Sequence, residues 1–225
     1  MSQSTTELGA GELIYRILAG ERDFTATRIA PGKALDEEDA YAQLLAYLRK
    51  QDLRASPVIA ERADWRGLKA HGLFLQSGRF AGADLSGADL SGADLRRSDF
   101  TGATFEGAHL NEAELTHSRF IEANFSHAQL RSADFYEANL TGAILRGADL
   151  SGAFLVRLSL QGADLTEATL SGADMYRVDL RGVIGMETTR DLARARLHRA
   201  IVTARESDIV EAALHRLPLF DLRDE

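Results

Sequence analysis

Histidines, serines and aspartates are the residues of this chain that could carry catalytic or metal-binding chemistry. The histidines are scattered along the sequence: His71, His109, His117, His127, His198 and His215. No two of them have the spacing that sets a pair of metal ligands on one face of a helix. Serines such as Ser86, Ser91 and Ser151 recur as surface positions of a repeat, and no histidine or aspartate partner is brought to them by the pattern. We therefore expect no catalytic residue, no metal, no cofactor and no enzyme activity.

A second set of residues is suited to binding. Arginine, histidine and glutamate recur at intervals of 20 residues, with further arginines and tyrosines beside them. They form one candidate partner-binding edge: Arg79, Arg96, Arg97, His117, Arg119, Tyr136, Arg157, Tyr176 and Arg177. Arginine and tyrosine are enriched in the hot spots of protein interfaces. The alternative is that these arginines are solvated or paired with neighbouring acids.

A five-residue repeat underlies these intervals. From Trp65 to Leu180 the chain keeps one phase through 24 windows, and Leu or Phe occupies the central position in 21 of them. Two residues before the centre Ala stands in 17 windows, and two residues after it Gly stands in 13. A period of five fits neither a helix nor a strand, so it predicts a coil that turns a corner every five residues, with the central residue and Ala inside. Burial of each large side chain contributes roughly 1.5–3 kcal/mol.

The predicted core consists of the central residues: Leu85, Leu90, Leu95, Phe100, Phe105, Leu110, Leu115, Phe120, Phe125, Leu130, Phe135, Leu140, Leu145, Leu150, Leu155, Leu160, Leu165, Leu170, Met175 and Leu180. The run AGADLSGADLSGADL resembles the A(D/N)LxG motif of the pentapeptide-repeat family, and the resemblance covers about 120 of the 225 residues. The family implies a mainly β fold, a right-handed quadrilateral β-helix with 20 residues in each coil. The repeat would then form about six coils.

Two of the four columns of repeats depart from the pattern. In one column the small inward position holds residues other than Ala at five of six levels: Gly78, Ser98, Ser118, Ala138, Leu158 and Val178. Compensated packing and a functional groove are both open interpretations. In the preceding column no Gly follows the centre, and this corner carries the arginine-rich edge. The other faces are more acidic.

The repeat and its two flanking segments divide the chain into three predicted regions. Residues 1–60 form an N-terminal capping segment with helices near 12–19 and 36–50, and the solenoid could begin at Phe24 and Ile29. Residues 61–185 form the β-helix. Residues 186–225 form a helical cap or a dimerisation element, with helices at 189–204 and from Ser207 to Leu217. The apolar tail Leu219 to Leu222 could fold back or pair two copies. The role of the 30–55 insertion is open.

Composition narrows the function. The net charge of −8 disfavours direct nucleic-acid binding, and the absence of cysteine fits a reducing compartment. We expect no signal peptide, no membrane span and a cytoplasmic location. The first hypothesis is a protein-interaction scaffold with an unidentified protein partner. The second, which the family resemblance implies, is a DNA mimic that binds DNA gyrase or another topoisomerase, protects it against fluoroquinolones and forms a homodimer through the C-terminal helices.

Overall fold

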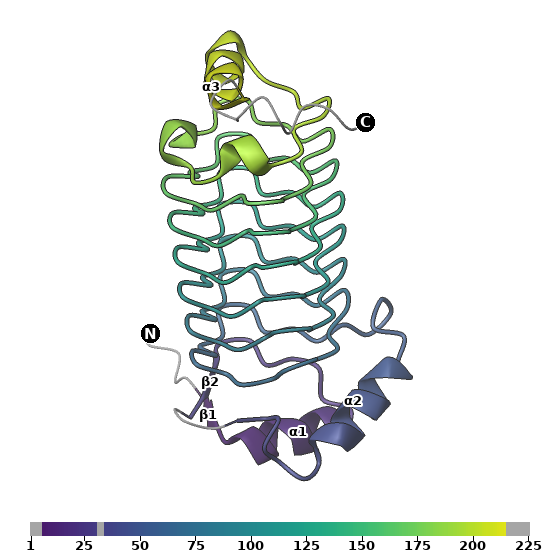
Figure 1. The fold of residues 1–225 in the computed structure, drawn as a ribbon. Helices are drawn as coiled ribbons and strands as arrows, with labels where there is room; N and C mark the ends of the chain where they lie inside the picture. The colour runs from purple at the N-terminus through teal and green to yellow at the C-terminus, as the bar shows by residue number, and fades with distance from the viewer. Residues whose placement is uncertain (1–5, 31–33, 215–225) are drawn as a thin grey trace.

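The computed structural model describes residues 6–30 and 34–214, which form a β-helical solenoid with helices at both ends (Figure 1). Parallel bridges join residues 20 apart throughout the middle of the chain, from Ile59 to Ile184. The bridges fall into four ladders, one on each side of the coil. The ladders pass through Arg79, Asp84, Asp89 and Asp94. Each side therefore carries one pentapeptide, and each full coil takes 20 residues.

A four-residue turn forms each corner. At one of them the N–H of Ala83 donates to the carbonyl of Phe80 at 3.0 Å, and Gly82 between them has a φ of 66°. Beyond the turn, the N–H of Leu85 donates to the carbonyl of Thr104 in the next coil at 2.7 Å. Every corner thus needs a residue with positive φ two positions after the central residue, which explains why Gly recurs there.

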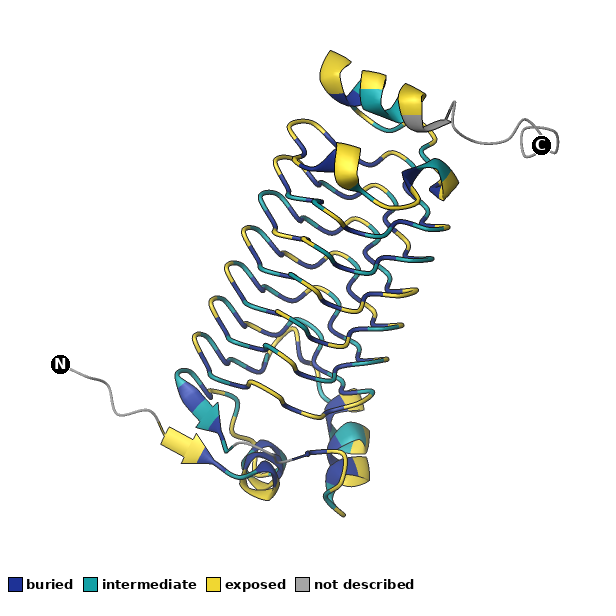
Figure 2. Ribbon diagram, turned by 60° about the vertical axis from the view of Figure 1, so that its left-hand side comes forward, coloured by how far each residue is buried: buried dark blue, intermediate teal, exposed yellow. Residues whose placement is uncertain are grey.

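The core fills the inside of the coils. All the central residues predicted from Leu85 to Leu180 are at most 2% exposed. Burial alternates along each side of the coil, as Figure 2 shows. Phenylalanines stack from coil to coil, with ring centroids 4.8 Å apart for Phe80 and Phe100 and 5.2 Å apart for Phe100 and Phe120.

Packing explains the column that lacks inward alanines. A Cβ on Gly78 would lie 2.2 Å from the ring of Phe80, so the stacked phenylalanines require a small neighbour. Ser98 is buried, and its hydroxyl accepts the N–H of Gly78 at 3.0 Å and donates to the carbonyl of Leu75 at 3.1 Å. Further along, Leu158 replaces the volume that phenylalanine supplies earlier. This column is therefore filled core and forms no groove.

At the N-terminal end, β1 (Thr6–Leu8) pairs in parallel with β2 (Thr27–Ile29). Helix α1 (Ala10–Leu18) lies between them in sequence, and α2 (Tyr41–Arg49) follows. Phe24 and Ile29 are buried, and their neighbours bridge to residues 36 positions later, so the solenoid begins there, before the predicted limit at residue 61. The prediction of a helix from residue 36 was wrong at its start, because residues 36–40 form turns.

The predicted helix at 189–204 was wrong. A short 3₁₀ helix, η1 (Met186–Thr188), precedes this segment, and the segment itself contains only a second one, η2 (Leu192–Arg194). It bridges to the preceding coil through Arg190, Arg196 and Ile201. The bridge ladders therefore continue to Ile201, beyond the predicted limit at 185. Helix α3 (Ala204–Leu214) follows.

The side chain of Glu206 caps the N-terminus of helix α3, as the glutamate of a capping box does. The carboxylate of Glu206 accepts the N–H of Thr203 at 2.7 Å and also the Thr203 hydroxyl, and its other oxygen accepts the N–H of Gly182 at 3.3 Å. These bonds attach α3 to the last coils. The helix starts before the predicted Ser207, and the predicted tail at Leu219 to Leu222 lies outside the described residues. None of the described helices is long and apolar enough to span a bilayer.

Candidate partner-binding edge

One corner of the solenoid has no glycine at the position with positive φ. We call it the arginine edge and define it by the residues at that position: Ser77, Arg97, His117, Glu137, Arg157, Arg177 and Arg199. Their φ values lie between 54° and 60°. At the other three corners most of the equivalent residues are glycines with φ near 65°. A left-handed conformation costs an ordinary L-residue about 1–2 kcal/mol, so this corner keeps side chains where glycine would be more stable.

Sequence reasoning placed Arg97, His117, Arg157 and Arg177 on this edge, and the structure stacks them in successive coils together with Glu137. Arg96, Tyr136 and Tyr176 lie in the same turns, one residue before the position with positive φ. Arg79 and Arg119 lie on the next side of the coil, where Asp99 separates them in the bridge ladder. His117 and Glu137 divide the arginines into an N-terminal and a C-terminal group.

Arg199 belongs to the edge and was not predicted. The coil that contains it is two residues longer than a regular coil, because Asp179 bridges to Ile201, 22 positions later. Counting in fives therefore loses the phase after Gly185. The signal that could have found Arg199 is the apolar series at Leu192 and Leu197, which continues the repeat once extra residues are allowed.

Several of the predicted arginines have carboxylate partners. Arg96 donates to both oxygens of Asp94, at 2.9 and 2.6 Å, and pairs with Glu114 at 3.0 Å. Arg79 pairs with Glu61. Arg157 pairs with Glu137 at 3.2 Å. The interpretation of paired surface arginines is therefore correct for these residues.

In the C-terminal part of the edge neither Arg177 nor Arg199 has an ion pair among the described residues, and Arg97 in the N-terminal part has none there either. The guanidinium of Arg177 lies over the ring of Tyr176, 5.4 Å from its centroid. Arg199 donates to the Tyr176 hydroxyl at a long 3.5 Å. Tyr176 in turn stacks on His198, with an interplanar angle of 11°. Tyr176 thus contacts both arginines, Arg177 through its ring and Arg199 through its hydroxyl, without neutralising them.

Glu137 ends this cationic region on its N-terminal side. Tyr136 and Arg157 both donate hydrogen bonds to it, and with His117 nearby they hold the pKa of the Glu137 carboxyl below its usual range. The carboxylate is therefore charged at neutral pH. It neutralises Arg157 in part, whereas Arg177 and Arg199 have no carboxylate partner within residues 6–30 and 34–214.

An open hollow lies along the C-terminal part of the edge. It is lined by Arg157, Arg177, Arg199 and Ile201 and has a volume of about 480 Å³. Ile201 is 49% exposed, and Phe154 on the adjacent side of the coil is 50% exposed. The surface therefore combines guanidinium groups with exposed apolar and aromatic side chains.

The aspartates of the other sides are engaged in local structure. Asp84 accepts the N–H of Ser86 at 3.0 Å and its hydroxyl at 2.6 Å. Asp149 and Asp164 make the same kind of turn and also pair with Arg131 and Arg146. These bonds stabilise the corners, and they neutralise part of the acidic surface.

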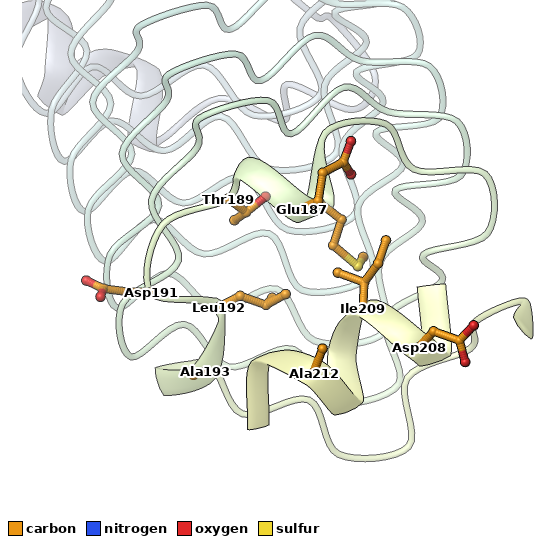
Figure 3. A pocket seen from close by; sticks show the side chains of 9 residues that line it. Glu187, Thr189, Asp191, Leu192, Ala193, Asp208, Ile209 and Ala212 are labelled. Atoms are coloured by element: carbon orange, nitrogen blue, oxygen red, sulfur yellow. The ribbon is translucent and has the colours of Figure 1, made fainter. Parts of the chain in front are cut away.

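A second concavity lies at the C-terminal end, between η1, η2 and α3 (Figure 3). Its volume is about 440 Å³, and Leu192, Ile209 and Ala212 lie around its apolar centre. The carboxylates of Glu187, Asp191 and Asp208 lie at its margin and do not converge on one point in this view. No group of three or more metal-ligating side chains occurs in the part of the chain that the structure describes.

In comparisons with known proteins, part of this chain matches the model of a repeat family. A family model described as pentapeptide repeats matches in eight copies, over residues 79–116, 108–147 and 143–182. No curated protein matches the chain in sequence.

Several solved structures are similar. HetL, a pentapeptide repeat protein involved in heterocyst differentiation regulation in the cyanobacterium Nostoc sp. strain PCC 7120, is 23% identical over 86% of this chain and 94% of its own, with a TM-score of 0.36. QnrB1, a plasmid-mediated fluoroquinolone resistance protein, is 19% identical over 72% of this chain and 99% of its own, with a TM-score of 0.30. A pentapeptide repeat protein of the Arabidopsis thaliana thylakoid lumen is 34% identical over 46% of this chain and 68% of its own, with a TM-score of 0.19.

Proposed function

We propose that this protein, which belongs to the pentapeptide-repeat family, is a non-enzymatic binding module that docks a protein partner on the arginine edge. One observation carries the proposal. The edge keeps long side chains at left-handed positions where the other corners mostly have glycine. Residues held in such costly conformations cluster at functional sites.

The chemistry of the edge supports the same conclusion. Arg177 and Arg199 have no carboxylate partner among the described residues and therefore keep their capacity to bind one. Tyr176 presents a ring beside them, and Phe154 and Ile201 add exposed apolar area. Desolvated arginine and tyrosine side chains are the usual energetic centre of a protein interface.

The alternative is the DNA-mimicking gyrase-binding protein that the family resemblance implies, and the similarity to the fluoroquinolone resistance protein QnrB1 belongs with it. A DNA mimic needs a continuous acidic surface. This chain meets that requirement poorly, because arginines neutralise part of its acidic surface by pairing with Asp64, Asp149, Asp164 and Asp179. The assay for the alternative is supercoiling by purified DNA gyrase with a fluoroquinolone present. Rescue or inhibition of supercoiling by the added chain would replace the proposed function.

We also propose that the terminal helices cap the rod. Leu13 and Ile17 of α1 and Leu44 and Leu48 of α2 are at most 2% exposed, so they extend the core beyond the first coil. Pairing of two copies through the C-terminal helices is the further proposal for this end. Light scattering during size-exclusion chromatography measures the mass of the particle and decides it.

The partner-binding proposal is tested with a triple variant and a matched control. Arg157→Ala, Arg177→Ala and Arg199→Ala together remove the guanidinium groups of the C-terminal edge. Arg66→Ala, Arg131→Ala and Arg146→Ala remove the same charge from other corners. The immobilised chain and both variants are incubated with an extract of the source cells, and the retained proteins are quantified by mass spectrometry.

A genuine partner is retained by the unmodified chain and by the control and is lost from the edge variant. The partner is then purified, and its affinity is measured by calorimetry. If the purified partner binds the edge variant as tightly as the unmodified chain, the arginine edge is not the docking site and the proposal is wrong.

A further inference from the structure

We infer that the hollow between Arg157, Arg177 and Arg199 binds a short acidic peptide segment of the partner, through the carboxylates of that segment. This inference rests on the proposed function and adds the chemistry of the ligand. The three guanidinium groups stand on successive coils, and adjacent coils are about 4.8 Å apart. The site therefore presents three cations along roughly 10 Å of the rod.

The positive charge of the hollow favours the binding of an anion. Only one of its arginines has a carboxylate partner among the described residues, namely Arg157 with Glu137. Arg177 and Arg199 line the same hollow without such a partner, so each repels the other. Guanidinium groups bind carboxylates through paired, charge-assisted hydrogen bonds, and bound carboxylates would relieve that repulsion.

The surroundings of the hollow favour a short peptide over a long polyanion. Glu137 closes the cationic stretch at one end, and the whole chain carries a net charge of −8, which repels an extended nucleic acid. An exposed Ile201 lines the hollow, so an apolar side chain next to the acids would find a contact. In a polyproline II segment every third residue returns to the same side after about 9.3 Å, which matches two coil spacings. Acidic residues three positions apart can therefore reach Arg157 and Arg199 together.

Glu137 acts as a competitor inside the site. It accepts a hydrogen bond from Arg157 and places a negative charge where the ligand would end. Replacing it with glutamine keeps the shape of the side chain, frees Arg157 and removes the repulsion. The inference therefore predicts that Glu137→Gln, which leaves all three arginines in place, binds the acidic peptide more tightly.

The experiment measures fluorescence anisotropy of a labelled hexaglutamate peptide at low ionic strength, with the full chain and three variants. We expect the double variant Arg177→Gln, Arg199→Gln to weaken binding by at least about tenfold, because each guanidinium contributes charge-assisted hydrogen bonds. The control Arg131→Gln, Arg146→Gln removes equal charge at other corners and should change affinity by less than about twofold. Glu137→Gln should tighten binding by about threefold or more.

Three results would overturn the inference. Equal losses in the edge variant and the control would show that only the net charge matters. Tighter binding of a labelled six-nucleotide single-stranded DNA than of hexaglutamate would identify a nucleic-acid surface. No binding of the peptide at millimolar concentration would show that the hollow takes no acidic segment.

The same variants separate this inference from the proposed function. If hexaglutamate fails to bind but capture of the purified partner depends on the edge, the partner docks there by other chemistry and only the inference is wrong. If hexaglutamate binds as expected but the purified partner binds the edge variant as tightly as the unmodified chain, the hollow is an anion site and the proposed function is wrong.

Discussion

Glycine in place of the three arginines of the hollow should give a more stable protein than alanine at the same positions, and both replacements should abolish binding at the edge. Two triple variants isolate the backbone contribution. Arg157, Arg177 and Arg199 are changed together to Ala in one and to Gly in the other. Both variants lose the same guanidinium contacts, including the pair with Glu137 and the stacking on Tyr176. They differ in whether the residue with positive φ has a Cβ.

The expected difference follows from φ values of 56° to 57° at these positions. A left-handed conformation costs an L-residue about 1–2 kcal/mol, and the greater freedom of Gly in the unfolded chain offsets about 0.5–1 kcal/mol of that. The net gain is about 0.5–1 kcal/mol at each site and about 1.5–3 kcal/mol for three. For a chain of this length, 1 kcal/mol shifts the melting temperature by about 2–4 °C, so the Gly variant should melt roughly 3–12 °C above the Ala variant.

The assay is thermal unfolding followed by circular dichroism, combined with the hexaglutamate binding measurement on the same samples. Gly162→Ala is the reciprocal control at another corner, where φ is 68° and a Cβ would meet no neighbour within 4 Å. It should lower the free energy of unfolding by about 1 kcal/mol. Equal melting temperatures for the Ala and Gly triple variants would refute the argument that side chains at these positions with positive φ lower the free energy of unfolding.

Three further predictions concern the core, a buried hydrogen bond and pH. Leu115→Arg should abolish cooperative unfolding, because Leu115 is fully buried and the new charge would have no partner; an unchanged melting curve would refute the register of the repeat. Ser98→Ala should cost about 1–3 kcal/mol because the buried N–H of Gly78 loses its acceptor. Ser86→Ala in a half-buried surface turn should cost far less, and chemical denaturation measures both values. Hydrogen bonds from Arg66 and Arg181 lower the pKa values of Asp64 and Asp179. The two ionised carboxylates therefore stabilise the fold fully above the ordinary carboxyl range, and this stabilisation is lost as the pH falls through the lowered pKa values. The melting temperature should be constant near neutral pH and decline below about pH 4, and the decline should be less steep in Asp179→Asn.

The core could be read from the sequence because its signal is periodic. Every central residue from Leu85 to Leu180 is buried, and the missing glycines correctly marked one corner as different. The sequence also indicated that Phe24 and Ile29 already belong to the coil. A period of five needs only residue types and counting, and burial of each large side chain outweighs local helix or strand preference.

The C-terminal end could not be read in the same way. Leu192, Leu197 and Ile201 fit both a helical face and a lengthened coil, and the insertions that lengthen the coil break the count of five. The bridge from Asp179 to Ile201 decides between the two, and it is a contact between residues distant in sequence. The predicted start of α3 at Ser207 was wrong, although Thr203 and Glu206 have the spacing of a capping box.

The geometry of a pentapeptide solenoid restricts where a recognition site can arise. Residues on the flat sides lie in bridge ladders, and acids such as Asp84 are tied into the turns beside them. Where glycine occupies the position with positive φ, no side chain projects from that position, and only the residue before it, such as Arg66 or Arg146, carries one. A corner without glycine is therefore the place where long side chains from successive coils can stand in one row. Because each such residue costs stability that glycine would restore, a row of arginines there is hard to explain by folding alone, and an acidic ligand supplies the missing interaction.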